Sequence, residues 1–113
     1  RWAIFNEDGA SMPPGTLFNI EYATNAAASA VVTTTEANQL NNAVTFTPAR
    51  QNASATRFWA TPNWNPGSSF GVLNNHLIGV MYIFPNTREG VILNQDVASM
   101  PLGASFNVVF AWA

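Results

Sequence analysis

The chain has 113 residues, contains no cysteine and no lysine, and is only 9% charged, with a formal net charge of −2 at pH 7. This length predicts one domain with its own core, and the lack of cysteine excludes disulfides, cysteine zinc sites and thiol chemistry. Four scattered arginines give no basic surface, so nucleic acid is not an expected partner, and no apolar run approaches the ~20 residues of a membrane helix. Solubility must come from Asn, Thr, Ser and Gln, a composition common in extracellular proteins, and we expect a secreted protein.

The predicted elements are short strands separated by turns, because Thr, Val, Phe, Trp, Asn, Gly and Pro dominate the sequence. In chain order we expect strands at residues 2–6, 17–23, 30–35, 43–48, 55–61, 78–84, 90–94 and 105–112. The best helix candidate, residues 35–41, is barely two turns long, with Thr35 as its cap. This pattern predicts an all-β fold, an antiparallel β-sandwich of about seven or eight strands.

An internal repeat joins the two ends of the chain. Residues 5–20 read FNEDGASMPPGTLFNI, and residues 93–108 read LNQDVASMPLGASFNV. At an offset of 88 residues and without a gap, the identical pairs include Asn6 and Asn94, Asp8 and Asp96, Met12 and Met100, Pro13 and Pro101, Gly15 and Gly103, Phe18 and Phe106, and Asn19 and Asn107. Residues 1–25 therefore repeat residues 89–113 within a single domain spanning residues 1–113.

Each copy of the repeat predicts a strand, a stiff loop and a second strand, since Pro fixes φ and Gly permits positive φ. We expect the Met and Phe of each copy to point inward, and the side chains of Asn6, Asp8, Asn94 and Asp96 to accept hydrogen bonds from backbone N–H groups. Both copies are expected to form equivalent β-arches. The N-terminal copy then either packs within its own domain or adds to a neighbouring molecule's sheet, as in a homo-oligomer, a ring or a filament.

Two motifs carry a resemblance to a known family. Residues 61–84 read TPNWNPGSSFGVLNNHLIGVMYIF, and residues 90–108 read GVILNQDVASMPLGASFNV. They resemble a family of small uncharacterised secreted domains found mainly in bacterial extracellular proteins, often in tandem; the resemblance covers residues 35–110, and residues 1–20 match its closing third again. It implies a secreted β-rich unit and no particular activity. The chain departs from the family pattern at Ser68, Leu73 and Gly90, where Gly, Tyr and Trp are usual, and Trp2 keeps that last aromatic residue.

A patch of aromatic and amide side chains at residues 58–71 is the first candidate site. Trp59 lies in a strand-like run and is expected in the core, whereas Trp64 lies in a loop. Aromatic faces beside amides can stack on a sugar and bond its hydroxyl groups. The alternative is that Trp64 folds back over the end of the sandwich. The candidate ligand-binding residues are Asn63, Trp64, Asn65, Asn74, Asn75 and His76.

The titratable residues do not form a legible catalytic pattern. His76 is the only histidine, and no G-x-S-x-G motif or other nucleophile context accompanies it, so we expect a structural role. The repeated residues Asn6, Asp8, Asn94 and Asp96 form either a second site or structural turns. Asn94 and Asp96 supply at most two oxygen ligands, fewer than calcium requires. We therefore predict no catalytic residues, no metal and no cofactor.

Two functions from different classes remain open. The first is a non-catalytic, lectin-like extracellular module that binds a glycan or cell-surface carbohydrate. The alternative is a structural subunit of a self-assembling extracellular or cell-surface oligomer or filament. Low charge, stiff loops and a repeated terminal motif are typical of both.

Overall fold

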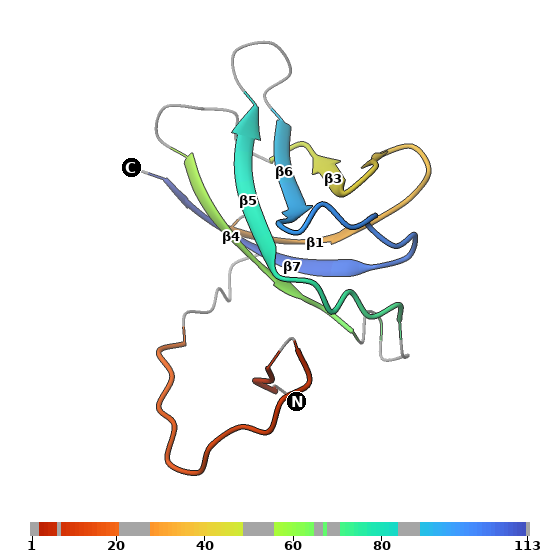
Figure 1. The fold of residues 1–113 in the computed structure, drawn as a ribbon. Helices are drawn as coiled ribbons and strands as arrows, with labels where there is room; N and C mark the ends of the chain where they lie inside the picture. Colours follow the sequence, from red (N-terminus) through yellow and green to blue (C-terminus); the bar gives the residue numbers. More distant parts are fainter. Residues whose placement is uncertain are drawn as a thin grey trace.

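The computed structural model describes residues 3–6, 8–20, 28–48, 56–64, 67, 71–83 and 89–112 (Figure 1). Within these residues the predicted antiparallel β-sandwich is confirmed. One sheet has the strand order β1-β7-β4 and the other β2-β3-β6-β5, and all pairings between these strands are antiparallel. The seven strands are β1 (Ser29–Thr33), β2 (Gln39–Leu40), β3 (Ala43–Phe46), β4 (Thr56–Pro62), β5 (Ile78–Ile83), β6 (Glu89–Asn94) and β7 (Ser105–Trp112).

β6 and β7 are both inner strands, one in each sheet. β6 lies between β3 and β5, and β7 lies between β1 and β4. Their alternate side chains face the core, because successive residues of a strand point to opposite faces. The core cluster consists of Val32, Val44, Phe58, Ile92, Met100, Ala104, Phe106, Val108 and Phe110. More than half of these residues come from β6, β7 or the loop between them, so this segment supplies most of the core.

The segment formed by β6, residues 95–104 and β7 crosses from one sheet to the other, and we call it the C-terminal arch. Its loop is fixed to the earlier strands through backbone hydrogen bonds. The Met100 N–H donates to the Asn41 carbonyl, and the Gly103 N–H to the Thr34 carbonyl, each at 2.8 Å. Met100 is completely buried beneath this loop. The arch is therefore stabilised along its whole length by neighbours outside it.

Six of the eight predicted strands are confirmed, with each end within two residues of its predicted position. The helix predicted at residues 35–41 is wrong. Asn38 closes a turn there, because its side-chain oxygen accepts the Thr35 N–H at 2.7 Å and its amide donates to the Thr33 carbonyl. β2 follows at once and pairs with β3 through a tight turn in which Asn41 has a φ of +50°. Asn tolerates this left-handed conformation, so the hairpin replaces the helix.

The two strands predicted in the first copy of the repeat are not formed in its described residues, 3–6 and 8–20, which we call the N-terminal arm. The arm extends away from the sandwich (Figure 1). Its turn nevertheless matches that of the arch. The Ala10 N–H donates to Asp8 Oδ1 at 2.9 Å, as the Ala98 N–H does to Asp96 Oδ1 at 3.1 Å. The expected acceptor role of both aspartates is confirmed.

Further features of the turn agree between the two copies. Asn6 Nδ2 donates to the Ala10 carbonyl at 2.9 Å, and Asn94 Nδ2 to the Ala98 carbonyl at 3.0 Å, so the amides donate to carbonyls where acceptance from N–H groups was expected. Gly15 and Gly103 have φ values of +82° and +83°. The equivalent positions Gly9 and Val97 also share positive φ. The local sequence therefore specifies the same turn twice.

The packing of the two copies is unlike. Phe106 is 0% exposed and Phe18 is 46% exposed, while Leu17 is 93% exposed. Met100 is buried, whereas Met12 is only partly covered. The expectation that both ends form equivalent arches is thus wrong beyond the turn. The physical reason is that a strand requires neighbours to bond to, and the arm has none of those that hold the arch.

Candidate functional site

Asn63 and Trp64 follow directly on β4, where the strand leaves its sheet. The Asn63 N–H donates to the Ser105 carbonyl at 2.7 Å, and Asn63 Nδ2 donates to Asn107 Oδ1 at 2.9 Å. The Trp64 carbonyl accepts the Gly71 N–H at 2.7 Å, and the residue is 49% exposed. Trp64 therefore presents a half-exposed aromatic side chain on an anchored backbone. Asn65 lies outside the described residues.

Asn74 and Asn75 precede β5 and differ in their surroundings. Asn74 is 2% exposed, and its Nδ2 donates to Asn94 Oδ1 at 2.7 Å. Asn94 in turn donates to the Ala98 carbonyl. This chain of amides ties the segment before β5 to the turn of the arch, which is a framework role for Asn74. Asn75 is exposed.

His76 and Asp96 form an exposed pair between the same two segments. His76 Nδ1 lies 2.7 Å from Asp96 Oδ2. The pKa of Asp96 is lowered from its ordinary value, first by the Ala98 N–H that its carboxylate accepts and then by the bond to His76. The pair thus links the arch to the segment before β5 at the surface. His76 is the single histidine of the sequence and bonds Asp96, so the repeated Asp8 has no equivalent link.

The predicted ligand residues lie beside different segments of the structure. The fold brings Asn74 and His76 to the turn of the arch, and it ties Asn63 to the beginning of β7. A shallow hollow brings Asn75 beside the arm, where Asn6 and Asp8 lie; its lining is Phe5, Asn6, Asp8, Asn75 and Leu77. The pairings of Asn74 with Asn94 and of His76 with Asp96 were not predicted, since each joins two motifs that are distant in the sequence.

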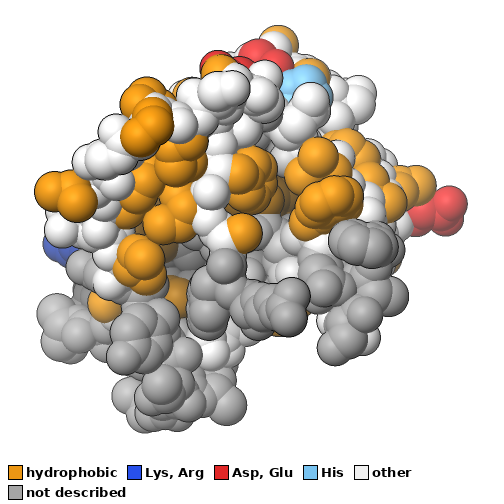
Figure 2. All heavy atoms as spheres, turned by 90° about the horizontal axis from the view of Figure 1, so that it is seen from below, with side chains coloured by type: hydrophobic (Ala, Val, Ile, Leu, Met, Phe, Trp, Pro, Cys, Tyr) orange, Lys and Arg blue, Asp and Glu red, His pale blue; other side chains and the backbone are white. Residues whose placement is uncertain are grey.

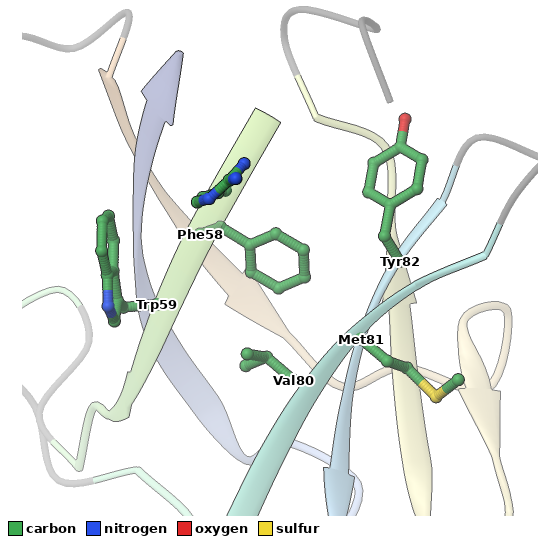
Figure 3. A pocket seen from close by; sticks show the side chains of 6 residues that line it. Phe58, Trp59, Val80, Met81 and Tyr82 are labelled. Atoms are coloured by element: carbon green, nitrogen blue, oxygen red, sulfur yellow. The ribbon is translucent and has the colours of Figure 1, made fainter. Parts of the chain in front are cut away.

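A second, apolar groove lies at the open side of the sandwich between β4 and β5 (Figure 3). Its lining is Arg57, Phe58, Trp59, Val80, Met81 and Tyr82. Trp59 is 48% exposed, so its expected place in the core is wrong. Phe58 takes the core position on β4, and adjacent residues of a strand cannot both face the same side. That alternation is the sequence signal that separates the two residues.

Gly90 of β6 and Phe46 of β3 are paired across the ladder and packed against each other. A Cβ placed on Gly90 would lie 2.4 Å from Cζ of Phe46, so the Phe46 ring fills the space that a side chain at position 90 would need. The ring is held there by Phe58 and Phe110, whose centroids lie 5.2 and 6.2 Å away. The sequence analysis did not predict this pair, although Gly90 replaces the Trp2 of the other copy.

Residues 3–6, 8–20, 28–48, 56–64, 67, 71–83 and 89–112 contain no group of three or more His, Cys, Asp or Glu side chains placed to hold a metal ion. Over the same ranges, none of the structure has the helical length and apolar character needed to cross a bilayer.

Fold and sites together define a small all-β sandwich domain in which one arch motif occurs twice, once packed and once exposed. The chain belongs to the family described as a domain of unknown function, DUF7452, whose model matches residues 1–110. The match agrees with the expected resemblance at the level of an uncharacterised domain family, and it includes both copies of the motif. Searches of curated proteins and of solved structures found no match.

Proposed function

We propose that this domain is a structural unit that assembles with other units of its fold, and that its N-terminal arm supplies the two inner strands of a neighbouring sandwich. The observation that carries this proposal is the difference between the two copies of the motif. The arm forms the turn of the C-terminal arch, yet the side chains that correspond to the arch's core residues are exposed.

The arm carries the residues needed for the inner positions. Ile4, Phe18 and Ile20 are at least 45% exposed, and they correspond to Ile92, Phe106 and Val108, each 0% exposed. Burying one such side chain contributes about 1.5–3 kcal/mol. A partner with five strands equivalent to β1–β5, but without β6 and β7, would bury all three at once. Figure 2 shows apolar side chains gathered on the face seen from below, with few charges among them.

The setting we propose for this assembly is extracellular, and its function is non-catalytic. The sparse charge, with Asn, Thr, Ser and Gln in place of charged residues, supports an environment outside the cell. The hydrogen bonds of His76 and Asp96 support a structural role for both, because the pair fastens two loops together.

The test is a two-unit chain in which residues 26–88 are placed before residues 1–113. The added unit carries β1–β5 but lacks β6 and β7, and we call it an open unit; the arm follows it directly. Position 2 is changed to glycine to match Gly90, over which Phe46 packs. Linkage raises the effective concentration of the arm to the millimolar range. Hydrogen exchange of residues 3–6 and 17–20, followed by mass spectrometry, reports whether the arm has formed strands.

We expect these arm amides to exchange more slowly in the two-unit chain than in the single chain, and the protein to sediment as a monomer. The matched control is Phe18→Asp in the same two-unit chain, which places a charge at a core position and should abolish the protection. Arm exchange that is equally fast in all three proteins would refute the proposal.

Carbohydrate binding remains a second candidate because Trp64 presents a half-exposed aromatic side chain on an anchored backbone. The test is a glycan array probed with the full chain and with Trp64→Ala, using Trp59→Ala as a matched exposed tryptophan. Binding that is lost only in Trp64→Ala would support a sugar site at residues 63–64. Binding that is unchanged in this variant, or that is absent from the full chain, would refute it.

A further inference from the structure

The arm and the C-terminal arch share most core positions, and two of their differences lie where a side chain of another strand contacts the arch. Position 2 is Trp where the arch has Gly90, and position 17 is Leu where it has Ser105. Both Gly90 and Ser105 are buried in the sandwich. These two differences therefore bear on which open unit the arm fits.

The first difference concerns the space beside Phe46. Gly90 lies on the core face of β6, two residues from Ile92, and its Cβ position is already filled by the Phe46 ring. Phe46 packs edge-on against Phe58 and is tilted against Phe110. A tryptophan at this position would have to displace the ring from that aromatic cluster, and overpacking of this kind is destabilising. An open unit that carries Phe46 can thus bind an arm with glycine at position 2, whereas an arm with Trp2 would bind it weakly.

The second difference concerns a polar contact between β1 and β7. The Ser105 hydroxyl lies 2.7 Å from Thr33 Oγ1, its partner across the ladder, and Ser105 is 3% exposed. Leu17 has no polar atom with which to replace this bond and has a larger side chain. Thr33 is exposed, so water can bond its hydroxyl when the serine is replaced, and the loss is small. The difference at position 17 therefore adds little to the specificity of the arm.

From the first site we infer that the partner of the arm is a unit of the same fold but of different sequence, with a small residue where Phe46 stands. The inference rests on the proposed function and adds which partner sequences the arm can bind. A second, identical copy of this chain is rejected by the same contacts that stabilise its own arch. Discrimination of this kind needs an unfavourable contact with the wrong partner as well as a good one with the right partner.

The test exchanges both sides of the first contact in the two-unit chain. The leading copy carries either Phe46 or Phe46→Ala, and the arm carries either Trp2 or Trp2→Gly, which gives four proteins. We call two of these proteins matched: the one that combines Trp2 with Phe46→Ala, and the one that combines Trp2→Gly with Phe46. We expect the arm to be protected from hydrogen exchange in both. In the protein that combines Trp2 with Phe46, exchange should be faster by on the order of tenfold or more.

The four proteins separate the inference from the proposed function. Protection that follows the matched pairs supports both. Equal protection in all four leaves the proposed function standing and overturns the inference. An arm that exchanges rapidly in all four overturns both.

A double-mutant cycle in the single chain tests the same contact without the added unit. Gly90→Trp gives β6 the residue of the arm, and Phe46→Ala removes the ring that occupies its space. We expect each single variant to unfold at a lower urea concentration than the native chain, and the double variant to recover part of the loss. A Gly90→Trp variant as stable as the native chain, or a double variant no better than the sum of the singles, would overturn the inference.

Discussion

The N-terminal arm and the C-terminal arch are two segments with nearly the same sequence in unlike environments. Their turns agree in side-chain hydrogen bonds and in backbone conformation, while their strands do not: β6 and β7 are inner strands, and residues 3–6 and 17–20 form no strand. The comparison separates two kinds of information. Bonds within four residues specify a turn wherever it occurs, whereas a strand pair also requires the neighbours that bury it.

The largest expected effect lies at the repeated phenylalanine. Phe106→Ala should lower the free energy of unfolding by about 3–5 kcal/mol, because it leaves a cavity among completely buried side chains. Phe18→Ala, the matched control, should change it by less than about 0.5 kcal/mol, since the arm is exposed. Urea unfolding followed by circular dichroism measures both. A large loss in Phe18→Ala would mean that the arm packs on its own domain.

The repeated asparagine should show the next largest difference. Asn94→Ala removes the donor to the Ala98 carbonyl and the acceptor for the buried Asn74 amide, so a loss of about 1–3 kcal/mol is expected. Asn6→Ala removes only the exposed bond to Ala10 and should have little effect on the same transition. Similar losses in the two variants would contradict the assignment of Asn74 to the framework.

The repeated glycine should give a smaller contrast. Gly103→Ala forces a Cβ into a φ of +83°, 3.1 Å from Cγ2 of Val72, and should cost about 1–2 kcal/mol. Gly15→Ala imposes nearly the same φ, +82°, but meets no atom within 4 Å. Its strain should appear as fraying of the arm's turn in NMR spectra, with an unchanged urea midpoint. A shifted midpoint in Gly15→Ala would show that the turn of the arm is coupled to the sandwich.

The smallest expected effect is the pH dependence of the repeated aspartate. The pKa of Asp96 is lower in the folded protein, so its contribution is present above the unfolded pKa of about 3.9 and is lost as the pH falls through the folded value. Stability should therefore decline slightly below about pH 4. Because the carboxylate is exposed, the decline should be small; it should be reduced further in Asp96→Asn. A decline of the same size in Asp96→Asn would assign it to other groups.

The sequence predicted those features that depend on short-range patterns. Alternating apolar residues gave six strands, and the Asn-x-Asp and Pro-x-Gly spacings gave the turn. The helix predicted at residues 35–41 was wrong because so short a stretch is compatible with both a helix and a hairpin turn. Asn38 and Asn41 favour the turn. The exposed arm could not be predicted, since its residues are those of a buried strand pair.

The candidate site was less predictable because its contacts join distant segments. Asn74 and Asn94 are 20 residues apart, and Phe46 and Gly90 are 44 apart, so neither pairing leaves a local pattern. Trp64 was placed correctly in a loop, whereas Trp59 was expected in the core and is half-exposed on β4. The alternation of β4 assigns one face to Phe58 and the other to Trp59.

The late place of β6 and β7 in the strand order of the sandwich has a consequence for synthesis. Since β6 and β7 hold both sheets together, neither sheet can be completed before residues 89–112 have left the ribosome. Until then β3 and β5, like β1 and β4, lack the strand that lies between them, and such unpaired edges are prone to misassociation. Chaperones that cover nascent β-strands would therefore act on this sandwich until β6 and β7 have emerged.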